Sequence, residues 1–90
     1  MSESVVTNVP ALIEFRSRLI RFNELLDEEY HAVAREWEQL GDVWRDRKYE
    51  ELGTALHEVG RGIERYLSEA PDHEMQLRRF IERAQAFLDA

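Results

Sequence analysis

The sequence predicts an all-α protein: a long antiparallel helical hairpin with a C-terminal third helix, which we expect to dimerise into a helical bundle. Two long stretches carry apolar residues every three or four positions, the spacing of an amphipathic helix. A short charged segment within residues 40–51 separates them, and Pro71 precedes a third such stretch. Ninety residues form one domain, and a chain of this length buries only about 60–65% of its unfolded surface. Association with a partner would relieve that thin margin of stability.

The first helix is predicted over residues 10–44. It begins at Pro10, because a proline in the first turn lacks only an N–H that would have no partner there. Its apolar stripe consists of Leu12, Phe15, Leu19, Phe22, Leu26, Tyr30, Val33, Trp37, Leu40 and Trp44. Because Trp44 keeps the phase of the stripe, the helix is extended through Gly41, at a cost of about 1 kcal/mol relative to alanine. In the alternative interpretation, Gly41 ends the helix and Asp42 caps the next one.

The second helix is predicted over residues 46–70. Asp46 is suited to the N-cap, because a carboxylate there accepts hydrogen bonds from the free N–H groups of the first turn. Glu50 and Glu51 then complement the positive end of the helix dipole. The stripe of this helix is a regular heptad of Tyr49, Leu52, Leu56, Val59, Ile63, Tyr66 and Ala70. Heptads pack at a shallow crossing angle, so the two stripes are expected to face each other.

Three glycines interrupt the second helix. Gly53 and Gly60 lie seven residues apart and next to the stripe, so each marks either a close approach of a neighbouring helix or a tolerated exposed position. Gly62 is interpreted as a tolerated exposed position.

A third helix is predicted over residues 72–89, because proline disfavours a helical conformation at the residue before it and acidic residues follow Pro71. Its apolar face is formed by Leu77, Phe80, Ile81, Ala84, Phe87 and Leu88. The heptad of the second helix nevertheless continues in phase through Leu77 and Phe80. A single kinked helix from Asp46 to Leu88 is therefore the alternative.

Two isoleucines of the first helix point away from its main stripe. Ile13 and Ile20 lie seven residues apart and about 130° from the centre of that stripe, at ~100° per residue. The second helix therefore cannot cover them, and either a folded-back third helix or a second subunit must do so. We predict that Ile13 and Ile20, together with Phe80 and Phe87, form the dimer or partner interface.

Composition argues against several classes of protein. The formal charge of −7 does not suit a surface that neutralises phosphates, so no nucleic-acid partner is expected. No apolar run approaches the roughly 20 residues of a membrane-spanning helix, so no membrane span is expected. The absence of cysteine excludes disulfides, thiolate catalysis and cysteine-ligated metals.

No motif indicates catalysis. Glu28 and His31 form a Glu-x-x-His pair of the kind found in di-iron bundles, but neither His57 nor His73 has a glutamate three residues earlier to supply a second pair. We interpret Glu28 and His31 as part of a solvated face. The apolar stripes also contain no polar group that would line a pocket for a small molecule. The chain is predicted to be no enzyme, to bind no metal or cofactor, and to have no small-molecule substrate.

The corner between the first two helices carries a recognisable motif. Trp44-Arg45-Asp46, followed by Tyr49, resembles the Trp-x-Gly corner of the WXG, or ESAT-like, family of small helical hairpins in bacterial type VII secretion. The resemblance covers about residues 10–70, with Asp46 in place of the glycine and without the Tyr-x-x-x-Asp/Glu export signal. It implies a hairpin that pairs antiparallel with itself or a sister protein into a four-helix bundle. Trp44 is expected to clamp the hairpin, to anchor a partner, or to do both.

These features predict a non-enzymatic protein–protein interaction module whose partner is itself or a related helical protein. The alternative is a self-contained three-helix adaptor, antitoxin or immunity-type protein in which the third helix covers Ile13 and Ile20. The N-terminus has no basic and apolar regions of a signal peptide. A cytoplasmic location is therefore expected, with export by a route that uses no signal peptide as the other open possibility.

Overall fold

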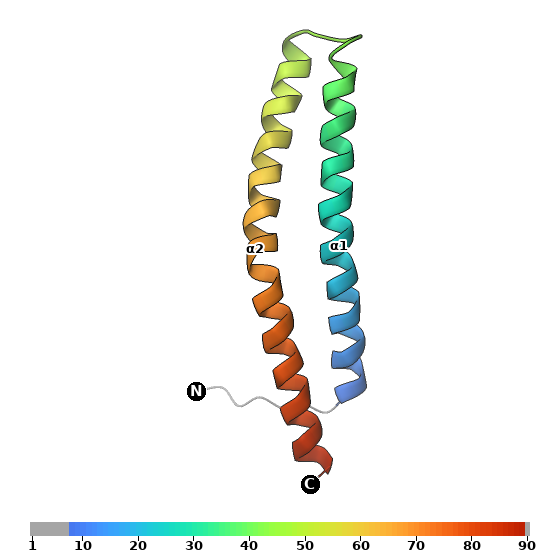
Figure 1. Ribbon diagram of the computed structural model, residues 1–90, viewed down its shortest axis with the longest axis vertical. Helices are drawn as coiled ribbons and strands as arrows, with labels where there is room; N and C mark the ends of the chain where they lie inside the picture. Colours follow the sequence, from blue (N-terminus) through green and yellow to red (C-terminus); the bar gives the residue numbers. More distant parts are fainter. Residues whose placement is uncertain (1–7, 90) are drawn as a thin grey trace.

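A computed structural model describes residues 8–89, which form two long helices joined by a short corner (Figure 1). Helix α1 spans Val9–Leu40 and helix α2 spans Arg47–Asp89. The helices run antiparallel and pack against each other, which confirms the predicted hairpin. The molecule measures 64 × 26 × 18 Å, and its Cα radius of gyration of 19.6 Å compares with about 12 Å for a compact 90-residue domain. The hairpin is therefore a rod made of a single layer of two helices.

Helix α1 begins with a capped first turn. The Asn8 side-chain oxygen accepts a hydrogen bond from the Ala11 amide at 3.0 Å, as an N-cap residue does. Pro10 follows inside the first turn, where its missing N–H removes no intrahelical bond. The start of the helix thus lies within one residue of the predicted start at Pro10.

Helix α1 ends at Leu40, so its predicted extension to Trp44 is wrong. Gly41 keeps near-helical dihedral angles, with φ −59° and ψ −18°, but the residues after it form only turns. The Trp44 amide bonds back to the Leu40 carbonyl at 2.8 Å. The alternative interpretation was right that the helix ends next to Gly41. It was wrong about the next cap, because α2 begins after Asp46 and not after Asp42.

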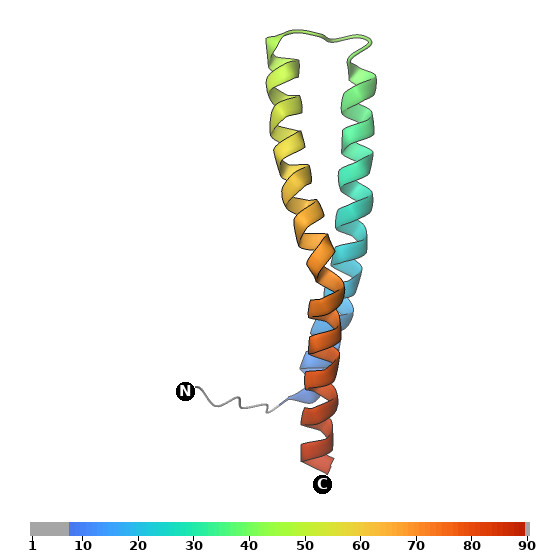
Figure 2. The ribbon, with the colours of Figure 1, turned by 60° about the vertical axis from the view of Figure 1, so that its left-hand side comes forward.

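Helix α2 is continuous through Pro71, so the separate third helix predicted over residues 72–89 is wrong. Ala70 and Ile81, on either side of the proline, are both buried, so the contact with α1 continues past it, although Ile81 lies one residue beyond the predicted heptad position Phe80. Pro71 itself is exposed, and the ribbon bends rather than breaks in this part of α2 (Figure 2). Packing of one continuous apolar face against α1 therefore outweighs the local cost of the proline.

The stripe of α1 that contacts α2 is rotated from the predicted one. Asn23 is only 6% exposed, whereas the neighbouring Phe22, which the prediction placed in the contact, is 51% exposed. About two turns earlier, Arg16 is likewise half-buried while the neighbouring Phe15, which was predicted to contact α2, is exposed. The predicted contact residues that the structure leaves exposed are Phe15, Phe22, Val33 and Leu40 on α1, and Leu52 and Val59 on α2.

Very few apolar side chains are enclosed. Among the described residues, the buried apolar ones are Val9, Tyr49, Ala70 and Ile81. The accessible surface is 7597 Å², against about 5,500 Å² for a compact monomer of the same mass. Two helices in one layer have no second layer against which to bury their remaining apolar sides. Neither described helix is long and apolar enough to cross a membrane.

Candidate functional site

The corner is organised around Tyr49, which is 1% exposed. Its ring stacks on Trp37 of α1, with ring centroids 4.4 Å apart and planes 13° from parallel. Trp44 packs against the same residue in a T-shaped arrangement, with ring centroids 5.4 Å apart and planes at 80°, and the Arg45 guanidinium lies 5.1 Å from the Tyr49 centroid. The structure therefore brings Trp44, Asp46 and Tyr49 together as predicted, and adds Trp37 to them.

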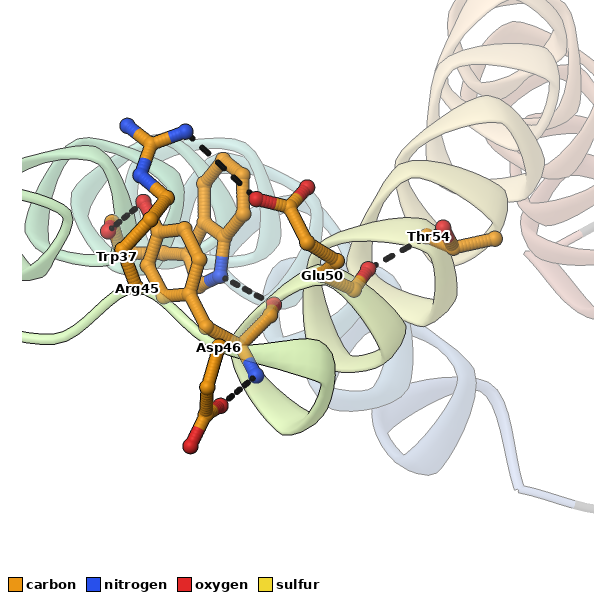
Figure 3. A network of polar contacts seen from close by, with 6 residues as sticks. Trp37, Arg45, Asp46, Glu50 and Thr54 are labelled. Carbon is orange, nitrogen blue, oxygen red and sulfur yellow. Dashed lines mark hydrogen bonds and ion pairs between the residues drawn. The ribbon is translucent and has the colours of Figure 1, made fainter.

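Two hydrogen bonds between Trp37 and Tyr49 join the ends of the two helices (Figure 3). The Tyr49 hydroxyl donates to the Trp37 carbonyl at 2.8 Å, and the Trp37 indole N–H donates to the Tyr49 carbonyl at 3.2 Å. The Trp37 carbonyl is one of the last four of α1, which lack an intrahelical donor. A Cβ on Gly41 would lie 2.7 Å from the tyrosine hydroxyl, so this approach depends on the glycine. Ring stacking and two hydrogen bonds between Trp37 and Tyr49 thus hold the ends of α1 and α2 together at the corner.

Asp46 caps the N-terminus of α2, as predicted. Its carboxylate accepts a hydrogen bond from the Tyr49 amide at 3.0 Å (Figure 3). That bond, and then one from the Trp44 side chain, hold the pKa of Asp46 below its ordinary value, because both stabilise the ionised form. Asp46 therefore fixes where α2 starts and places Tyr49 one turn into the helix.

The lowered pKa of Asp46 predicts a dependence of stability on acid pH. Because the folded-state pKa lies below the unfolded one, the carboxylate stabilises the fold fully above the unfolded-state value of about 3.9. This contribution is lost as the pH falls through the folded-state pKa. Asp46→Asn keeps an N-cap acceptor but does not titrate, so its free energy of unfolding should fall less steeply below about pH 4. Urea unfolding at several pH values checks this, and parallel pH profiles would contradict it.

A polar network lies between the helices in the middle of the rod. The Tyr66 hydroxyl donates to the Asn23 side-chain oxygen at 2.7 Å, and the Asn23 amide group donates to a Glu74 carboxylate oxygen at 2.8 Å. Arg16 also donates to the Glu74 backbone carbonyl at 2.9 Å. The prediction of wholly apolar stripes is therefore wrong. Asn23 lies four residues after Leu19 and three before Leu26, and this spacing could have revealed its position.

Asn23→Ala is expected to lower the free energy of unfolding by about 1–3 kcal/mol, since the Tyr66 hydroxyl and the Glu74 carboxylate both lose their partner in a partly buried place. Urea unfolding followed by circular dichroism measures the change. The neighbouring Glu24→Ala is the control, because Glu24 is exposed and should change stability by no more than about 0.5 kcal/mol. Equal effects of the two substitutions would show that the network contributes nothing.

The structure does not unite the four residues predicted as an interface. Ile13, 45% exposed, and Ile20 line shallow grooves along one side of the hairpin, together with Arg78 and Ile81 of α2. Phe80 is half-buried, and Phe87 is 82% exposed near the open end of α2. These two phenylalanines lie on the opposite side of α2 from Arg78, at ~100° per residue. The predicted interface is therefore split between two sides of the rod.

A larger apolar surface, which we call the aromatic flank, lies on the side away from Ile13 and Ile20. Its core is formed by Phe15, Phe22, Val33 and Leu40 of α1 with Leu52 and Val59 of α2, all of them exposed. The assignment to one side follows from the grooves on the opposite side, which Ile20 lines together with Leu67, Pro71 and Arg78. Leu52 and Val59 lie on the other edge of α2 at ~100° per residue, as Phe22 does on α1.

The Glu28 and His31 pair makes no site in the structure. The His31 Nδ1 lies 2.8 Å from the carbonyl oxygen of Asp27, and both the histidine and Glu28 are exposed. Over residues 8–89, no three side chains of the metal-binding types converge. Besides the corner, the feature of the described residues that could serve a function is therefore the exposed apolar surface on the two sides of the rod.

No family model, curated protein or solved structure matches this chain. Function is therefore argued from the chain's own surface and corner.

Proposed function

We propose that this chain is a non-enzymatic protein–protein interaction module, a helical hairpin whose single layer is completed by the helices of a partner. The partner is a second copy or a related helical protein. The observation that carries the proposal is the exposure of twelve large apolar side chains along both helices and the corner. Exposed apolar surface of this extent, on both sides of the rod, marks protein–protein contacts.

The amount of exposed surface fits an extensive interface. The hairpin exposes about 2,000 Å² more than a compact monomer of its mass, and a standard interface buries about 800 Å² of each partner. Each fully buried Phe, Val or Leu side chain contributes about 1.5–3 kcal/mol. Because the six side chains of the aromatic flank are about half-exposed, covering all of them would contribute about 4–9 kcal/mol per copy before the entropic cost of association.

The corner supports a WXG-like form of this proposal. Trp44 and Tyr49 pack together between two long helices, and Asp46 caps α2 at the position where the family carries glycine. On this interpretation the chain is a substrate or a partner of a type VII secretion system. Export of the chain from cells with such a system, and its retention when the system is inactivated, is the test of this extension.

Light scattering and unfolding of the purified chain test the proposal itself. We expect a dimer or larger assembly at tens of micromolar, with an unfolding midpoint that rises with protein concentration, because association stabilises the folded state by mass action. A stable monomer whose unfolding midpoint does not depend on concentration would contradict it.

A further inference from the structure

We propose that the half of the aromatic flank next to the corner binds a basic amphipathic helix of a different protein. This half, which we call the corner surface, consists of Val33 and Leu40 of α1 with Leu52 and Val59 of α2. The bound helix contacts both helices of the hairpin, and Lys or Arg side chains border its apolar stripe. The inference rests on the proposed function and adds to it the binding face and the chemistry of the partner.

The corner surface offers apolar contacts at the spacing of a helix. Its four side chains are between 43% and 54% exposed, and the two on each helix lie seven residues apart. Seven residues are about two helical turns, so each pair occupies one face of its helix. A partner helix with apolar residues at heptad spacing can pack against both pairs at once. The centre of the site therefore selects an amphipathic helix.

Glutamates border the corner surface on α1. Glu29 and Glu36 follow the exposed Phe22 at intervals of seven residues, so they continue its line along the flank toward the corner. Both are exposed, and within residues 8–89 neither takes part in an ion pair. The outer edge of the flank thus changes from aromatic rings near the open end to carboxylates near the corner.

Glutamates also border the corner surface on α2. Glu51 and Glu58 directly precede Leu52 and Val59, whereas the glycines that directly follow these two apolar residues lie against rings of α1. At ~100° per residue, the two glutamates therefore lie on the outer edge, away from α1, and both are exposed. Glu51 pairs with Arg47 at 3.0 Å, but an exposed pair within one helix contributes little to stability.

The four glutamates form two pairs, each at one level of the rod and on opposite edges of the corner surface. Trp37 bonds to Tyr49, and Tyr30 bonds to the Leu56 carbonyl, which aligns the two helices. With this alignment the pairs are Glu29 with Glu58, and Glu36 with Glu51. In packed helices the charges that border an apolar stripe select the partner. Carboxylates on both edges therefore favour Lys or Arg on both sides of the partner's stripe.

The charge of the chain does not suit a second copy as the occupant. The corner half of the hairpin, residues 25–62, holds ten acidic and five basic residues. The open half, residues 8–24 and 63–89, holds eight acidic and seven basic residues. Neither half is basic, so a second copy offers no basic helix to the corner surface in any orientation. Contacts between copies remain available along the open half, where the charges nearly balance.

A designed peptide tests the proposal. The probe is a fluorescently labelled helix of three heptads with leucine at the two core positions, lysine at the two bordering positions and alanine elsewhere. Fluorescence anisotropy during titration with the unmutated chain is expected to show saturable binding that weakens as the salt concentration rises. A matched peptide with glutamate in place of each lysine should bind at least about tenfold more weakly. Equal binding of the two peptides, or no binding of either, would overturn the proposal.

Two variants of the chain with the same net charge test the face. The first replaces the four bordering glutamates, as Glu29→Gln, Glu36→Gln, Glu51→Gln and Glu58→Gln. The second replaces four exposed glutamates on the opposite side of the rod, as Glu24→Gln, Glu28→Gln, Glu38→Gln and Glu64→Gln. The first variant should bind the basic peptide about tenfold more weakly than the unmutated chain, and the second should bind it equally well. Equal weakening in both variants would show non-specific attraction and overturn the site.

Light scattering of the chain without peptide separates this inference from the proposed function. A chain that assembles with itself but does not distinguish the basic from the acidic peptide would overturn the inference and leave the proposed function standing. A monomer whose stability does not depend on concentration, and which binds neither peptide, would overturn both.

Discussion

Replacement of Tyr49 by alanine is expected to lower the free energy of unfolding by about 3–5 kcal/mol, the range for removing a buried aromatic ring. The ring is the most enclosed large side chain in residues 8–89, and it contacts Trp37, Trp44 and Arg45 at once. Its loss also leaves the Trp37 carbonyl at the end of α1 without a donor. Urea unfolding followed by circular dichroism measures the change.

Two further substitutions separate the contributions at the corner. Tyr49→Phe keeps the stacked ring and removes only the hydroxyl, so we expect a loss of about 1–2 kcal/mol. Trp44→Ala should cost less than Tyr49→Ala, because Trp44 is only half-buried and makes only a T-shaped contact with Tyr49. A larger loss for Trp44→Ala than for Tyr49→Ala would show that the tryptophan is the clamp of the corner.

The corner was largely predictable because its chemistry is local. An N-cap acceptor three residues before an aromatic residue acts through the backbone of a single turn, so Asp46 and Tyr49 could be assigned from their spacing. The end of α1 was not predictable in the same way. The phase of Trp44 fitted a longer helix, but the hydroxyl of Tyr49 lies close to Gly41 and the helix ends there. The contact between Gly41 and Tyr49 crosses the corner, so the apolar pattern of the first helix alone does not reveal it.

The contacting side of α1 was harder to predict because two apolar stripes overlap on this helix. Phe22 and Asn23 are neighbours at ~100° from each other, and apolarity alone favours the phenylalanine. The partners Tyr66 and Glu74 on α2 favour the asparagine instead, and they are invisible from the sequence of α1. Four of the ten residues of the predicted stripe thus belong to the exposed aromatic flank, and the other six are half-buried.

Pro71 shows the same competition between local and long-range effects. The proline predicted a boundary, and the heptad that continued beyond it predicted one kinked helix. Burial of Ala70 and Ile81 against α1 holds both sides of the proline in one helix. Consequently the C-terminal segment extends the rod and does not fold back over Ile13 and Ile20, which leaves both sides of the hairpin open to a partner.

The two helices approach each other closely at Gly60, so a substitution there is expected to have a large effect on stability. The Tyr30 ring lies against Gly60, where a Cβ would collide with its hydroxyl oxygen, and the same hydroxyl donates to the Leu56 carbonyl at 3.2 Å. Gly60→Ala is therefore expected to displace Tyr30 and to lower the free energy of unfolding by about 2 kcal/mol. Overpacking and the lost hydrogen bond together outweigh the ~1 kcal/mol that alanine contributes as a better helix former.

Gly62→Ala is the matched control, since the same substitution two residues later meets nothing within 4 Å in its own chain. It should raise the free energy of unfolding by about 0.5–1 kcal/mol through helix propensity alone. The opposite signs distinguish a glycine required by packing from one that is merely tolerated, although both lie in the same helix. Urea unfolding of the two variants measures both changes. If Gly60→Ala were as stabilising as Gly62→Ala, the contact of the Tyr30 ring with Gly60 would not hold the two helices together.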